Sequence, residues 1–173
     1  MKKNFSLYPT LCWLLFAITI TSCGKKENVS YSLNNLDIKA SGPLFSGANV
    51  AQVVHKVDLS KIEKNGGIQP KNIVGAKLTK AEIYNYSGES ISMDDVTISI
   101  VSENVEMKKI AFLNPVPKNS NNTALVIAQE QDDIEEYFQE KEFTIVADIN
   151  IAEDLMDDYV FNGNFEFELT INN

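Results

Sequence analysis

Arginine is absent from this 173-residue sequence, so every one of its basic residues is a lysine. The chain therefore lacks the side chain best suited to bidentate recognition of phosphates and base edges. Its formal net charge is −9, and an acidic body repels an anionic polymer. On both grounds we expect no nucleic acid among the partners.

Cysteine, histidine and tryptophan are also scarce, with two, one and one copies respectively. A P-loop, a G-x-G-x-x-G, an H-E-x-x-H and a G-x-S-x-G motif are all absent from the sequence. The sequence therefore predicts no catalytic residues, no metal site and no cofactor, and we expect the protein not to be an enzyme.

The first 22 residues have the pattern of a targeting segment. Lys2 and Lys3 precede an uncharged, mostly apolar run over residues 11–20, LCWLLFAITI. That run is shorter than the roughly 20 apolar residues that a helix needs to cross a bilayer. We predict a cleaved signal peptide over residues 1–22.

Ile20-Thr21-Ser22-Cys23 resembles the lipobox of bacterial lipoproteins. The resemblance implies cleavage before Cys23, lipid on its thiol, and anchoring to a membrane of the cell envelope. Gly24, rather than aspartate, follows the cysteine, which by the enterobacterial sorting rule implies the outer membrane. The alternative is an ordinary cleaved signal with a chance cysteine. We expect a lipidated cysteine and short tether over residues 23–30, and a single domain over residues 31–173.

Beyond Tyr31 the apolar residues recur mostly with period two, which is typical of half-buried strands. Strands are predicted over residues 32–40, 49–59, 74–86, 96–102, 107–113, 123–128, 143–151 and 159–171. One apolar and one polar face per strand favours antiparallel sheets. The fold class expected is an all-β, immunoglobulin-like β-sandwich of about seven or eight strands. Asn162-Gly163 is either a hairpin turn or a kink in one long strand.

Two short helices interrupt the strands. Ser60 and Glu63 form a capping box, and Asn65-Gly66 supplies a stop. Residues 132–138 begin with an acidic cap and place Ile134, Tyr137 and Phe138 on one side.

A second resemblance follows from this order of elements. The order is similar to that of small immunoglobulin-like lipoprotein domains of Bacteroidota-type bacteria. It consists of the capped turn, the strand near KLTKAEI, the D-x-x-E helix, EFTIVADINI and the closing strand. This resemblance covers about residues 50–172. It implies a fold and an envelope location, and it implies no activity.

Three sets of residues are candidates for a site. The single histidine, His55, shares the phase of Val53 and Val57 and is predicted to pack at the core margin. A bulge near Thr79-Lys80 would turn Tyr84 and Tyr86 outward as an exposed pair for a protein partner or a glycan. The alternative is that one of the two tyrosines is buried under a loop.

The third set consists of acidic clusters. These are Asp94-Asp95, residues 132–136 and residues 153–158. They leave two alternatives open, a calcium-dependent surface adhesin and a carboxylate-based hydrolase. The reading we favour is an outer-membrane lipoprotein, held to the membrane through lipid on Cys23. Its domain is a binding or structural module, with an envelope protein or glycan as partner.

Overall fold

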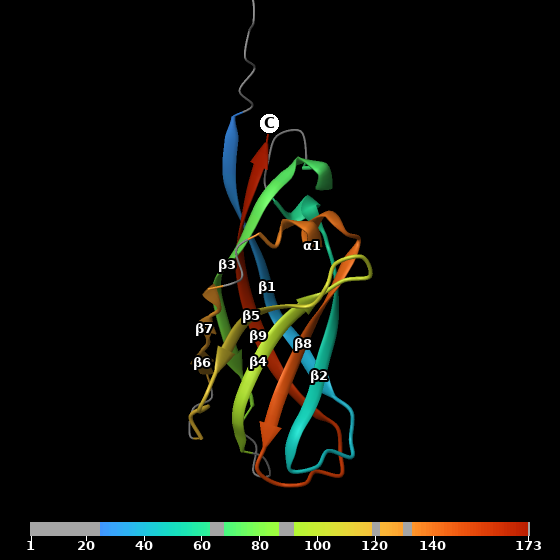
Figure 1. The fold of residues 1–173 in the computed structure, drawn as a ribbon, viewed down its shortest axis with the longest axis vertical. Helices are drawn as coiled ribbons and strands as arrows, with labels where there is room; N and C mark the ends of the chain where they lie inside the picture. The colour runs from blue at the N-terminus through green and yellow to red at the C-terminus, as the bar shows by residue number, and fades with distance from the viewer. Residues whose placement is uncertain (1–24, 63–67, 87–91, 119–121, 130–132, 173) are drawn as a thin grey trace, which may run out of the picture.

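The structure is a computed structural model, and it describes residues 25–62, 68–86, 92–118, 122–129 and 133–172. Strands make up most of these residues (Figure 1). They are β1 (Lys26–Ala40), β2 (Gly47–Lys56), β3 (Ile73–Tyr84), β4 (Met93–Val101), β5 (Lys108–Leu113), β6 (Asn122–Ala124), β7 (Val126–Ile127), β8 (Glu142–Ile151) and β9 (Tyr159–Asn172). The predicted signal peptide, Cys23, Glu63, Asn65-Gly66 and Asp132 lie outside the described residues.

These strands belong to one antiparallel sheet in the order β6-β3-β9-β1-β2-β8-β4-β5-β7. The two strands at the ends of that order, β6 and β7, are separated in the chain by Leu125 alone. The Leu125 N–H donates to the Ala81 carbonyl on β3 at 2.9 Å, and the Ala128 N–H donates to the Ile110 carbonyl on β5 at 3.0 Å. Residues 122–128 therefore join the two ends, and the sheet curls round on itself.

The predicted all-β antiparallel fold is confirmed. Its form is barrel-like rather than clearly a sandwich, because the strands follow one another round a single sheet. The weakest join lies between β1 and β2, which pair only at Lys39 and Gln52. Elsewhere β1 pairs with β9, and β2 with β8. Which strand is the neighbour of which depends on tertiary contacts, and alternation along one strand carries no such information.

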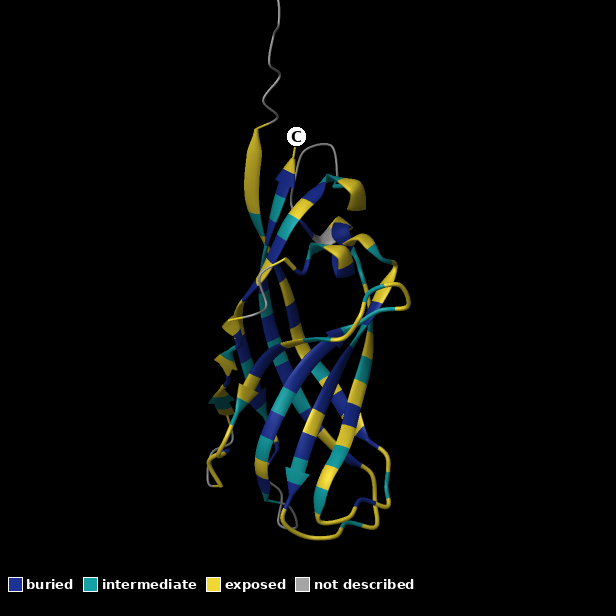
Figure 2. Ribbon diagram, viewed as in Figure 1, coloured by how far each residue is buried: buried dark blue, intermediate teal, exposed yellow. Residues whose placement is uncertain are grey.

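The apolar faces predicted from the alternation line the interior. Figure 2 shows buried and exposed bands alternating along the strands. In β8 and β9 the in-phase residues from Phe143 to Ile151 and from Tyr159 to Ile171 are buried. Each fully buried large apolar side chain contributes roughly 1.5–3 kcal/mol to folding, so this interior is the main source of stability.

β9 runs unbroken through Asn162-Gly163, so a hairpin turn at this point is wrong and the alternative of one long strand is confirmed. Gly163 is buried and pairs with Leu36 on β1 and with Ile83 on β3. A Cβ there would lie 2.7 Å from Cε2 of Phe165 and 3.0 Å from Cδ1 of Ile38. Close packing across the strand is what requires glycine.

β1 begins at Lys26, and not near Tyr31 as the alternation suggested. The predicted tether over residues 23–30 is therefore too long at its C-terminal end. Residues 26–30 pair in register with the end of β9, from Lys26 opposite Asn172 to Ser30 opposite Glu168. Nearly all of these β1 residues are exposed, so no apolar face marks them as a strand, and only the pairing does.

In the described part of the chain three short helical segments are named: η1 (Leu59–Lys61), η2 (Pro70–Asn72) and α1 (Glu135–Gln139). In the first, Asp58 is the cap, and its carboxylate accepts the Ser60 N–H at 3.1 Å. Ser60 itself was the predicted cap, so the cap lies two residues earlier. The last helix starts later than predicted, because Ile134 is its N-cap and no side chain caps it. The burial of Ile134, Tyr137 and Phe138 on one side is confirmed.

No helix among the described residues is long and apolar enough to cross a membrane.

Candidate functional site

Tyr84 and Tyr86 do not form an exposed pair. The predicted bulge is present, because the register of β3 against β9 shifts between Leu78 and Lys80. Tyr86, however, is 1% exposed. The alternative that one tyrosine is buried is the correct one.

A single residue between the tyrosines causes this difference. β3 ends at Tyr84, and Asn85 takes a left-handed conformation with φ of 55°, which asparagine tolerates better than most residues. The chain turns there, and Tyr86 no longer follows the strand's alternation. Its hydroxyl bonds to the Thr123 hydroxyl and donates to the Pro117 carbonyl at 3.3 Å. Tyr86 is therefore part of the packed interior.

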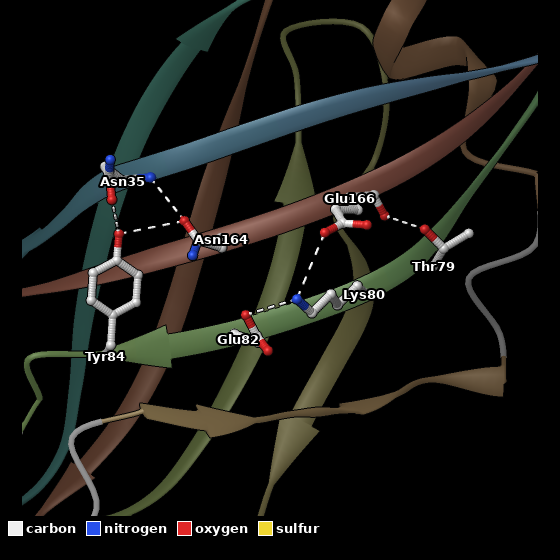
Figure 3. Close-up of polar contacts among 7 residues, drawn as sticks. All are labelled: Asn35, Thr79, Lys80, Glu82, Tyr84, Asn164 and Glu166. Atoms are coloured by element: carbon white, nitrogen blue, oxygen red, sulfur yellow. Dashed lines mark hydrogen bonds and ion pairs between the residues drawn. The ribbon is translucent and has the colours of Figure 1, made fainter.

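Tyr84 is half-buried and belongs to a polar network on the outer side of the sheet (Figure 3). Its hydroxyl donates to the side-chain oxygens of Asn35 on β1 and, at 3.4 Å, of Asn164 on β9. The Asn164 oxygen also accepts the Asn35 backbone N–H at 2.9 Å. Asn35 has φ of 56° and lies at a bulge between Leu33 and Leu36. Three strands thus hold the tyrosine ring in one orientation.

A second network lies further along the same face, around Lys80 (Figure 3). The Lys80 ammonium group is 3.1 Å from Glu82 and 3.7 Å from Glu166. The hydrogen bond that the Lys80 ammonium donates to the Glu82 carboxylate is the main cause of the raised pKa of Lys80. The Thr79 hydroxyl donates to the Glu166 backbone carbonyl at 2.9 Å. The bulge thus places a charged lysine between two carboxylates.

Similar polar pairs continue across the three strands. They are Asn162–Asp37 at 2.6 Å, Asn85–Asn162 at 2.8 Å, Lys77–Glu168 at 2.7 Å and Thr170–Asn28 at 3.0 Å. We call the outward side of β1, β9 and β3 that carries these pairs and the two networks the polar face.

The polar face is also hollowed. A depression of about 490 Å³ is lined by Asn28, Gly75, Ala76, Lys77, Asp133, Glu168 and Thr170. Its size is within the range of ligand sites, roughly 300–1,000 Å³. One amide, two carboxylates, a lysine and one hydroxyl surround it, and this mixture of donors and acceptors can exchange hydrogen bonds with a hydroxyl-rich molecule.

His55 packs at the core margin, as predicted. It is half-buried, its Nε2 is 2.8 Å from the Tyr31 hydroxyl, and its ring lies 5.3 Å from that of Phe143. The Tyr31 hydroxyl also accepts the Asp58 N–H at 3.1 Å. The pKa of the Tyr31 hydroxyl is raised, mainly because the group is buried. The pair bridges the strands β1 and β2 where they have diverged.

Three members of the acidic clusters, Asp95, Asp154 and Asp158, have hydrogen-bond partners that give them a structural role. Asp95 accepts two hydrogen bonds from the Asn150 amide, at 2.8 and 2.9 Å. Asp154 accepts the Ser46 N–H at 2.7 Å, and Asp158 accepts the Gly42 N–H at 2.9 Å. In the part of the chain that the structure describes, no three His, Cys, Asp or Glu side chains are grouped so that they could hold a metal ion.

The sequence pattern pointed to Tyr84 but missed Asn35 and Asn164. One signal was available, because Asn34-Asn35 interrupts the alternation of the first strand, and asparagine is frequent at bulges with positive φ. The pairing of Asn35 with Asn164 joins residues 129 positions apart, and no local pattern predicts it.

Compared with known proteins, the chain matches no protein-family model and no curated protein.

Proposed function

We propose that the protein is a lipid-anchored lipoprotein of a bacterial cell envelope, and that its domain is a non-catalytic binding module. The lipobox at Cys23 carries the proposal. The attached chains supply the anchoring energy, about 0.8 kcal/mol for each buried methylene, and two or more chains make the anchoring stable.

The position of β1 supports this proposal. Only two residues lie between Cys23 and the start of β1 at Lys26, and the three steps of chain from one to the other span at most about 11 Å. β1 enters at one end of the long axis, beside the C-terminus (Figure 1). Its 15 residues span roughly 50 Å. A lipid on Cys23 would hold that end close to the bilayer, with the opposite end free to point away from it.

The anchor is tested by replacing Cys23 with alanine and fractionating the cells. Cys12→Ala is the matched control, because Cys12 lies inside the predicted signal peptide. We expect Cys23→Ala to leave the membrane fraction and Cys12→Ala to stay in it. A Cys23→Ala protein that remains bound to membranes would contradict the lipid anchor.

We assign ligand binding to the polar face, and the ligand class it fits best is a glycan of the envelope. Two separate features of the face support it: the depression, lined by one amide, two carboxylates, a lysine and a hydroxyl, and the fixed ring of Tyr84, which lies outside the depression on the same face. The test is co-sedimentation of the purified protein with isolated cell-wall sacculi. Tyr84→Ala should weaken binding about fivefold to tenfold, whereas Phe112→Ala, an exposed aromatic on β5, should leave it unchanged. Equal binding by the two variants would remove the polar face from the proposal.

A further inference from the structure

Two loops lie together at the end of the molecule opposite the C-terminus (Figure 1). Residues 41–46 join β1 to β2, and residues 152–158 join β8 to β9. They are tied by an antiparallel bridge, in which the Leu44 N–H donates to the Leu155 carbonyl at 2.7 Å and the Leu155 N–H donates to the Leu44 carbonyl at 2.9 Å. We call these two loops the distal tip.

Further hydrogen bonds fix the backbone of the distal tip. Asp154 and Asp158 accept the backbone N–H groups of Ser46 and Gly42 across the two loops. The Asn49 side chain bonds both backbone groups of Phe45, at 3.3 Å to the N–H and 2.7 Å to the carbonyl. A surface that is already ordered loses little conformational entropy when a partner binds to it.

This fixed backbone presents large apolar side chains to solvent. Met156 is 71% exposed and Phe45 is 60% exposed, the two highest values among the exposed large apolar residues described. Val50 and Val160, near the first residues of β2 and β9, are 56% and 43% exposed. Phe45 and Met156 each follow one residue of the Leu44–Leu155 bridge, so the bridge brings these two positions together. Exposed apolar side chains that lie close together mark contact surfaces, and aromatic residues and methionine are enriched there.

All charged side chains of the two loops are acidic. The loop over residues 152–158 carries Glu153, Asp154, Asp157 and Asp158, and neither loop contains a lysine. The nearest ion pair is Lys39 on β1 with Asp158, at 2.5 Å. Such loops repel anionic lipid and a second copy of the same acidic tip, and they attract a basic surface.

We propose that the distal tip is a docking surface for a protein that presents lysine or arginine side chains around an apolar socket, with Phe45 and Met156 as the side chains that enter the socket. The proposed lipid anchor would turn this tip away from the membrane. Only the orientation of the tip relative to the membrane rests on the proposed function. The docking surface itself is independent of the polar face.

The test is selection from a random dodecapeptide library displayed on phage. The full chain is immobilised through a tag after Asn173, at the end opposite the tip. Selected peptides are then measured against the double variant Phe45→Ser, Met156→Ser. Val54→Ser is the matched control, because Val54 is 57% exposed on β2, outside the tip. We expect peptides that combine lysine or arginine with large apolar residues. Their binding should be about tenfold weaker to the double variant and unchanged in the control.

Three other outcomes would overturn the proposal. Peptides that bind the double variant as well as the native chain would show that the tip is not the docking surface. Tip-dependent peptides without basic residues would refute the class of partner. Sedimentation showing a dimer that the double variant loses would assign the tip to self-association. Circular dichroism of each variant verifies its fold. None of these readouts depends on lipid at Cys23, so failure of the anchor and failure of the docking surface are distinguishable.

Discussion

Gly163→Ala offers a direct test of how β9 packs. The added Cβ would lie 2.7 Å from Cε2 and 3.1 Å from Cζ of Phe165, and 3.0 Å from Cδ1 of Ile38. Both neighbours are fully buried, so neither can swing into solvent to make room. Overpacking of this kind costs typically 1–3 kcal/mol.

A smaller effect opposes this cost. Replacing glycine by alanine reduces the entropy of the unfolded chain and by itself contributes about 0.4–1 kcal/mol of stability. The net expectation is therefore a loss of about 1–2 kcal/mol in the free energy of unfolding. For a domain of this size that loss lowers the melting temperature by roughly 2–8 °C.

The assay is urea unfolding of the purified protein, followed by far-ultraviolet circular dichroism. Gly75→Ala on β3 is the matched control. There the added Cβ would lie 3.3 Å from Cβ of Thr170, a half-buried residue at the surface of β9. We expect the control to change stability by less than about 0.5 kcal/mol.

A second substitution identifies the cause of the loss. Phe165→Leu removes the two ring atoms that the new Cβ would meet, so the double variant Gly163→Ala, Phe165→Leu should cost less than the sum of the two single changes, by about 1 kcal/mol. Additive costs within about 0.5 kcal/mol, or equal stabilities of Gly163→Ala and Gly75→Ala, would refute the reasoning.

Three further predictions concern hydrogen bonds and pH. Tyr86→Phe removes a buried hydroxyl bonded to Thr123 and should cost about 1 kcal/mol; an unchanged urea midpoint would contradict this. Burial raises the pKa of Tyr159 above the unfolded value of about 10. Stability should therefore be fully present below pH of about 10 and fall above it, and Tyr159→Phe should make the fall shallower; identical alkaline slopes would count against the burial effect. The pKa of Asp158 is lowered, first by its hydrogen bond with Lys39, so its contribution is present above about pH 4 and lost as the pH falls. Asp158→Asn should reduce the loss of stability in acid, and an acid midpoint like that of the native chain would refute the role of this pair.

Alternation by itself determined most of the strands. In β8 and β9 apolar residues recur at every second position and form one apolar face. Removal of that face from water is favourable whichever strand lies beside it. The bulge between Leu78 and Lys80 was also predictable, because a slip in the alternation reverses which side chains face inward. The same reasoning correctly placed His55 at the core margin.

Part of the candidate site was beyond such reasoning. Tyr84 was predictable from its phase, but its partners Asn35 and Asn164 come from strands distant in sequence. The burial of Tyr86 follows from one left-handed residue, Asn85, and from the chain at Pro117 and Thr123 that covers it.

The sequence alone therefore determined most of the strands and the inward residues within them, because alternation depends on neighbours along the chain. The tertiary structure decided the closure of the sheet by residues 122–128, the start of β1 at Lys26 and the meeting of the two loops at the distal tip. The physical reason is that backbone hydrogen bonds between strands are the same for every residue type except proline. Composition thus indicates that a segment is a strand, and only packing of the whole chain selects its neighbours.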